Sequence, residues 1–137
     1  MMTRIILGFV LVATMAGCGN PKHSQTELTP VKLETALSDQ ELAVQTLHEM
    51  LELAEKGDWG AYIDNHYGEQ DRYESPSDRD KLLKRFEEKW GEGILPHLRR
   101  AAKLPVRIDG EMAVFMDGDE PAFFLQRASD GTWKFHL

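Results

Sequence analysis

Two places in this chain carry residues whose types could do chemistry. The first is Cys18, the only cysteine among 137 residues. The second is a short stretch that holds Tyr62, Asp64, His66 and Tyr67. A thiol can take an acyl group, and a carboxylate or imidazole inside a pocket can be tuned toward neutral pH for acid–base catalysis. What surrounds each place decides which chemistry it could do.

The residues before Cys18 have the pattern of a secretory signal. Arg4 is the only charged residue among the first 21. An almost entirely apolar run from Ile5 to Met15 follows, and then two small residues, Ala16 and Gly17. The run is shorter than the roughly 20 apolar residues that span a bilayer. The pattern therefore predicts an export signal that is removed.

The residues Met15-Ala16-Gly17-Cys18 resemble the lipobox of bacterial lipoproteins, whose usual form is leucine, small, small, cysteine. The resemblance implies a signal peptide over residues 1–17, cleavage between Gly17 and Cys18, and diacylglycerol on the Cys18 sulfur. Two or more acyl chains hold a protein on a membrane far better than one chain does. The alternative is a plain signal peptide cut nearby, with Cys18 lost or left as a free thiol.

This anchor would place the protein in the bacterial cell envelope, with the membrane as its partner through the lipid. In a Gram-negative source we expect the outer membrane, facing the periplasm, because Gly19 is not the aspartate that retains enteric lipoproteins in the inner membrane. Residues 18–37 contain two prolines and many polar residues, so we predict a flexible tether there.

Composition limits the partners and the cofactors. The chain has a net charge of −7, which becomes −8 when residues 1–17 and their one arginine are removed. Nucleic acid repels an acidic domain, so we expect no nucleic-acid partner. With one cysteine no intramolecular disulfide can form. No residue cluster has the spacing of a metal site, and we expect neither a metal nor a cofactor.

Two helices are predicted after the tether. Ser38 and Glu41 have the spacing of a capping box, and Gly57 can take the left-handed conformation that ends a helix. Asp58 can cap a second helix from Trp59 to about His66. The apolar face of the first helix consists of Ala43, Leu47, Met50, Leu51 and Ala54.

Two further helices follow. Ser77 with Asp80 indicates the start of a third helix, which Gly91 and Gly93 would end. Pro96 suits the first turn of a fourth helix that ends near Lys103. The apolar side chains expected on one side of the third helix are Leu82, Leu83, Phe86 and Trp90.

Beyond Leu104 the pattern has a period of two, and three Asp-Gly pairs indicate hairpin turns at 109–110, 117–118 and 130–131. The predicted strands are 105–108, 111–116, 121–128 and 132–137. For the last turn we predict a three-residue loop over 129–131, which pairs Leu125 with Phe135 and Phe123 with Leu137 and puts all four on the buried face.

Helices followed by an antiparallel meander predict an α+β domain over residues 38–137, with N-terminal helices packed on a C-terminal four-stranded sheet. The stretches EKGDWGAY (55–62) and DGTWKFHL (130–137) resemble the nuclear-transport-factor-2-like superfamily, which implies a cone-shaped α+β fold. The superfamily holds isomerases, dehydratases, cyclases, transport factors and lipoproteins, so the resemblance does not select a function.

Enzymes of this superfamily place a tyrosine, aspartate or histidine inside the cone, so Tyr62, His66 and Tyr67 form a candidate pocket. The alternative is that Tyr62 packs in the core while Asp64, Asn65 and His66 face water. We assign no catalytic residue. The hypothesis is a non-enzymatic domain that binds an envelope protein or a small ligand; the alternative is a small pocket enzyme of the isomerase or dehydratase type.

Overall fold

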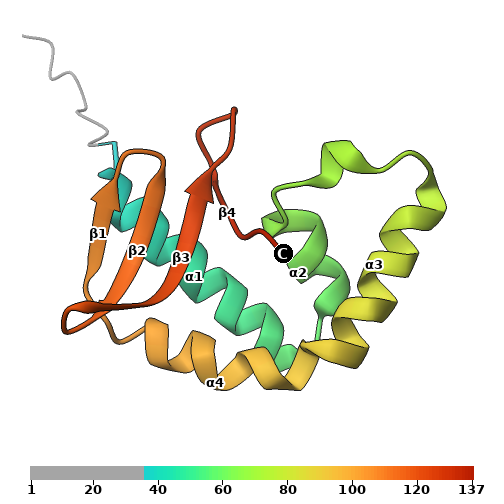
Figure 1. Cartoon of the computed structure of the whole chain (residues 1–137), viewed down its shortest axis with the longest axis horizontal. Helices are drawn as coiled ribbons and strands as arrows, with labels where there is room; N and C mark the ends of the chain where they lie inside the picture. Colours follow the sequence, from blue (N-terminus) through green and yellow to red (C-terminus); the bar gives the residue numbers. More distant parts are fainter. Residues whose placement is uncertain (1–35) are drawn as a thin grey trace, which may run out of the picture. The chain divides into compact units, whose positions relative to one another are not determined.

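The computed structural model describes residues 36–137, which form four α-helices followed by a four-stranded antiparallel sheet of order β1-β2-β3-β4 (Figure 1). This confirms the α+β class and the order of helices before strands. The elements are α1 (Asp39–Lys56), α2 (Trp59–His66), the 3₁₀ helix η1 (Gln70–Arg72), α3 (Pro76–Lys89), α4 (Gly91–Ala101), β1 (Val106–Asp109), β2 (Met112–Asp117), β3 (Glu120–Arg127) and β4 (Trp133–Lys134).

The predicted ends of α1 and the start of α2 are confirmed. The Ser38 backbone N–H donates to the Glu41 carboxylate at 2.7 Å, and the Glu41 N–H donates to the Ser38 hydroxyl at 3.3 Å, which completes a capping box. Gly57 ends α1 with a φ of +69°. The Asp58 carboxylate accepts from the Ala61 N–H at 3.0 Å and caps α2.

The boundaries of α3 and α4 differ from the prediction. The cap of α3 is Ser75 rather than Ser77, because Pro76 fits the first helical position and Asp78 completes a capping box by accepting from the Ser75 N–H at 2.8 Å. Helix α4 begins at Gly91, so Pro96 lies inside the helix rather than in its first turn. Pro96 has no N–H to donate to the Glu92 carbonyl, so α4 lacks one backbone hydrogen bond at this exposed position.

The hairpin turns form as predicted, with positive φ at Gly110, Gly118 and Gly131. The register of the last hairpin is also confirmed: Gln126 pairs with Lys134 and Arg127 with Trp133, around a three-residue loop. The predicted extent of the last strand is wrong.

Strand β4 has only two residues, because the chain then turns away from β3 toward the end of α2. The Phe135 N–H donates to the His66 carbonyl at 2.9 Å, and the Gly68 N–H donates to the Phe135 carbonyl at 2.9 Å. These bonds replace the predicted ladder partner of Phe135, and Leu137 is 50% exposed rather than buried.

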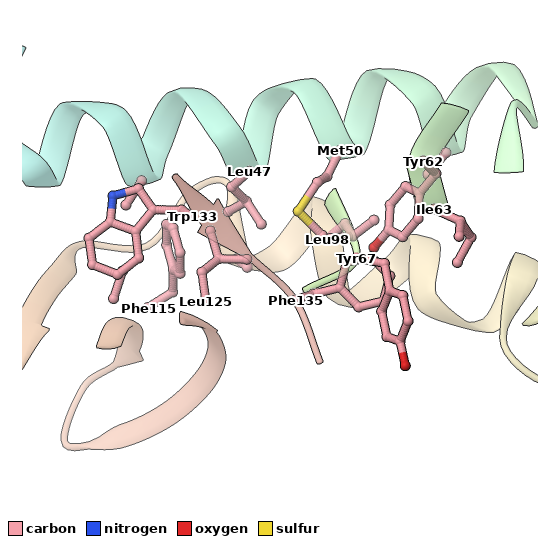
Figure 2. Close-up of a cluster of buried hydrophobic side chains, with 14 of the residues drawn as sticks. Leu47, Met50, Tyr62, Ile63, Tyr67, Leu98, Phe115, Leu125, Trp133 and Phe135 are labelled. Carbon is pink, nitrogen blue, oxygen red and sulfur yellow. The ribbon is translucent and has the colours of Figure 1, made fainter. Parts of the chain in front are cut away.

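A single hydrophobic core runs from the inner face of the sheet into the helices. Helix α1 contacts β1 and β4, and α4 contacts both α1 and β3. Figure 2 shows this cluster along α1, with Phe115, Leu125 and Trp133 from the sheet at one end and Tyr62 and Ile63 from α2 at the other. The core fixes α2 beside the residues that follow β4.

Candidate functional site

Tyr62, the first candidate pocket residue, lies in the packed interior. Its side chain is fully buried, and its ring lies 5.4 Å from that of Phe86 and 5.1 Å from that of Phe135. The Tyr62 hydroxyl has no hydrogen-bond partner among the described residues. Burial raises the pKa of this hydroxyl far above its usual value, so it stays protonated at neutral pH. It lines none of the three surface clefts described below.

His66, the second candidate, is 5% exposed, so the expectation that it faces water is wrong. The expectation holds for Asp64 and Asn65, which are exposed. The turn of α2 places His66 one helical turn after Tyr62, with 6.3 Å between the ring centroids. Burial lowers the pKa of His66; the charge of Glu49 opposes this shift and that of Lys134 adds to it. The imidazole therefore sits neutral inside the fold.

Asp64 has a structural partner. Its two carboxylate oxygens each accept a hydrogen bond of 2.6 Å from the Arg79 guanidinium, which ties α2 to α3. These bonds lower the pKa of Asp64. A carboxylate held this way is a poor general base, because its proton affinity is reduced.

Tyr67, the third candidate, lies at the boundary between the core and a cleft. Figure 2 shows its ring beside Phe135 with the hydroxyl pointing away from the cluster. The hydroxyl donates to the Glu69 carboxylate at 2.9 Å. Burial, followed by this hydrogen bond and the Glu69 charge, raises the pKa of Tyr67 to about 12. The structure thus brings Tyr62 and His66 together and places the Tyr67 ring beside Phe135, with its hydroxyl bonded to Glu69.

The cleft beside Tyr67, here called the polar cleft, has a volume of about 420 Å³. It lies between the segment after α2 and the β3–β4 hairpin, and its lining is Tyr67, Gly68, Gln70, Asp71, residues 127–130, Lys134 and His136. Most of its charged groups already have partners within the fold.

Three contacts engage the charges of the polar cleft. Arg127 forms an ion pair of 2.5 Å with Asp39 and lies 4.7 Å above the Trp133 ring. The Lys134 ammonium donates to the Asn65 carbonyl. An anionic ligand would have to compete with these contacts, so the polar cleft is a weak candidate for anion recognition.

A second cleft, here called the apolar cleft, lies between the first half of β3 and the residues that follow β4. It has a volume of about 270 Å³ and is lined by Ile94 of α4, residues 121–124 of β3 and residues 135–137. Phe124 and Leu137 are 51% and 50% exposed. Exposed large apolar groups gathered at one place mark an interaction surface more often than scattered ones do.

A third, shallow groove of about 490 Å³ lies between the start of α1 and β1. Its lining is Leu37, Gln40, Glu41, Val44, Gln45 and Val106. The Gln40 side-chain amide donates to the Val106 carbonyl at 3.4 Å, so the groove already holds a contact between its two walls.

Sequence reasoning missed the apolar cleft, although one signal pointed to it. Phe123 and Phe124 are adjacent in β3, and successive side chains of a strand point to opposite faces. One of the two had to lie on the face away from the helices. The structure buries Phe123 partly, 6.3 Å from the Phe115 ring, and exposes Phe124.

The predicted cleavage site and lipid site, Gly17 and Cys18, lie outside the described residues. Within residues 36–137 no cluster of His, Cys, Asp or Glu side chains is arranged to hold a metal ion. None of the helices that the structure describes is long and apolar enough to cross a bilayer. No family model, curated protein or solved structure matches the chain.

Proposed function

We propose that this chain is a lipid-anchored protein of the bacterial cell envelope whose folded domain binds a partner and does no chemistry on it. The anchor part rests on the sequence Met15-Ala16-Gly17-Cys18 after a short apolar run. The single observation that carries the binding part is the apolar cleft, where large side chains are exposed beside β3.

The placement of the chemically capable residues supports binding over catalysis. Tyr62 and His66 are packed among aromatic rings, and Asp64 is held by Arg79. A general base must come within hydrogen-bond distance of its substrate, directly or through one water. The runner-up, a pocket enzyme of the nuclear-transport-factor-2-like kind, requires a motion that opens the interior to Tyr62 and His66.

The experiment is mass spectrometry of the native N-terminus combined with fractionation of the envelope. The proposal expects a chain that begins at an acylated Cys18 and stays with the membrane fraction in buffer without detergent. Cys18→Ser is the matched variant, which should keep the uncleaved signal and lose the lipid mass. A native chain that retains Met1, or that appears in the soluble fraction, refutes the anchor.

A further inference from the structure

We propose that the free edge of β3 beside the apolar cleft binds an extended peptide of another protein as an added strand. One apolar side chain of the peptide would fill the cleft, and a basic residue would lie near the β2–β3 turn. This inference rests on the proposed function, because it names the site and the class of partner of that binding domain.

The first step is that part of the β3 edge has no strand beside it. Strand β3 pairs with β2 along its length, from Glu120 to Gln126, but β4 pairs only with Gln126 and Arg127. The Arg127 N–H donates toward β2, to the Glu111 carbonyl at 2.8 Å. Backbone groups of successive residues point to alternate edges, so those of Phe124 point away from β2. No residue of β4 pairs with Phe124, because β4 ends at Lys134, opposite Gln126.

The second step is the shape of the apolar cleft. One wall is β3, the other is residues 135–137, and Ile94 of α4 contributes to the lining. Its volume of about 270 Å³ lies just below the roughly 300–1,000 Å³ of pockets that enclose whole small ligands. A cleft of this size next to open backbone groups suits a side chain of a peptide whose main chain pairs with the strand.

The third step is the charge at the end of the cleft. Asp119 and Glu120 are exposed at the β2–β3 turn, next to Pro121 and Ala122 of the cleft lining. Asp117 on the same turn already pairs with Arg100. A peptide that carries Lys or Arg beyond its apolar anchor would place a positive charge beside two carboxylates. The net negative charge of the whole chain also favours a positively charged partner.

A free peptide fits this site better than a second copy of the chain. The incoming strand has to enter between β3 and residues 135–137. The β3 strand of a second copy carries its own β2 on its other edge, so a sheet rather than a single strand would have to enter there. An isolated extended peptide has both edges free and can insert.

The test uses a phage-displayed library of random linear octapeptides, selected on the purified full-length chain. We expect enriched peptides with apolar residues at alternate positions and Lys or Arg near one end. Hydrogen exchange with the strongest synthetic peptide should slow in residues 122–126. Light scattering over a range of concentrations should report a monomer.

Two peptide forms test strand addition directly. The strongest peptide is synthesised with N-methyl groups on every second amide, in one register or in the other. Only one register removes the donors that face β3, so that form should bind about tenfold or more weakly than the other. Equal weakening by both forms would mean that the peptide does not add as a strand.

Matched variants locate the site. Phe124→Glu and Leu137→Glu place a charge at the apolar cleft and should weaken binding about tenfold or more. Met112→Glu changes an exposed residue of the neighbouring strand that does not line the cleft, and should stay within about twofold of the parent chain.

Three further outcomes would overturn the inference. One is that selection on the chain enriches no peptide over a selection without it, and another is slowed exchange in residues 67–71 at the polar cleft instead of 122–126. The third is a dimer that Phe124→Glu dissociates, which would assign the edge to a second copy. Binding at the polar cleft would leave the proposed binding function standing, and the mass of the N-terminus decides the anchor separately.

Discussion

Residues 135–137 separate two regions of this molecule, a packed aromatic cluster and an open cleft. On one side Phe135 joins a closed aromatic cluster with Tyr62, Tyr67 and Phe86, at centroid distances of 5.1 to 6.0 Å. On the other side Leu137 faces the apolar cleft and an unpaired edge of β3. Tyr62 and His66 are in the closed region, and the open region offers apolar surface and backbone.

The difference has one origin, the departure of the chain from the sheet after Lys134. The Phe135 backbone does not pair with β3 and instead forms two hydrogen bonds, one with His66 and one with Gly68. The Phe135 ring joins the aromatic cluster. The same turn that closes the helical side therefore opens the strand edge. A change at this turn should act on both regions together, and a change elsewhere should act on one.

The largest effect is expected from Phe135→Ala. Phe135 is 4% exposed, and truncation of a buried Phe costs about 3–5 kcal/mol in the free energy of unfolding. Urea denaturation monitored by circular dichroism measures the loss. The matched control is Phe124→Ala on the open side, which should change the free energy by no more than about 0.5 kcal/mol. Similar losses for both would mean that Phe124 is covered and that the two regions do not differ.

A smaller effect is expected from Gly68→Ala, in the segment after α2 whose backbone bonds to Phe135. A Cβ there would lie 2.4 Å from His136 Nε2 and 3.1 Å from the Lys134 Cβ. The His136 ring can swing aside but the Lys134 backbone cannot easily do so, and we expect a loss of about 1–3 kcal/mol. Thermal unfolding measures it, and peptide binding should weaken as well, because His136 lines the apolar cleft.

Gly93→Ala is the control for that substitution. Gly93 lies within α4, and a Cβ there meets nothing within 4 Å. Replacing a helical glycine by alanine stabilises by roughly 0.5–1 kcal/mol. A loss at Gly93 as large as that at Gly68 would show that the effect is not steric.

Local rules predicted most of the fold. Caps at Ser38 and Asp58 and the glycine turns at 110, 118 and 131 depend on a few neighbouring residues, so they could be located from sequence. The three-residue loop and the register of the last hairpin followed from the buried face of Trp133 and Phe135. The order of helices before strands followed from the change of period near Leu104.

Contacts between distant segments could not be predicted in this way. The length of β4 depends on a competition between β3 and the end of α2 for the backbone of Phe135, and α2 is about 70 residues away in sequence. The burial of His66 also depends on distant segments, since the charges that act on its imidazole are those of Glu49 on α1 and Lys134 on β4. The apolar cleft exists only because β4 is short, so its position could not be inferred before that contact was known.

A still smaller effect is expected from Tyr62→Phe, which tests whether the closed region is really dry. The Tyr62 hydroxyl is buried without a partner among the described residues. Removing an unsatisfied buried hydroxyl should be neutral or should stabilise by about 1 kcal/mol. Urea denaturation measures the change. A decrease of about 1 kcal/mol or more in the free energy of unfolding would mean that the hydroxyl bonds to a trapped water or ligand. That result would support the alternative function, a pocket enzyme.

The smallest effect is the pH dependence that His66 adds to stability. Its folded pKa lies below its ordinary value of 6.5 because burial disfavours the charged imidazole. The unfolded chain therefore binds this proton at a higher pH than the folded chain does. The contribution is fully present above about pH 6.5 and is lost as the pH falls from there toward the folded pKa.

Urea denaturation between pH 7.5 and pH 5.5 measures this slope, in a range above the ordinary pKa values of the carboxylates. His66→Gln should flatten the slope, whatever its effect on stability at pH 7.5. His48→Gln is the matched control, since His48 is exposed on α1 and its loss should leave the slope in place. If the slope survived in His66→Gln, the imidazole would be reaching water, and the helical side of residues 135–137 would be as open as the β3 side.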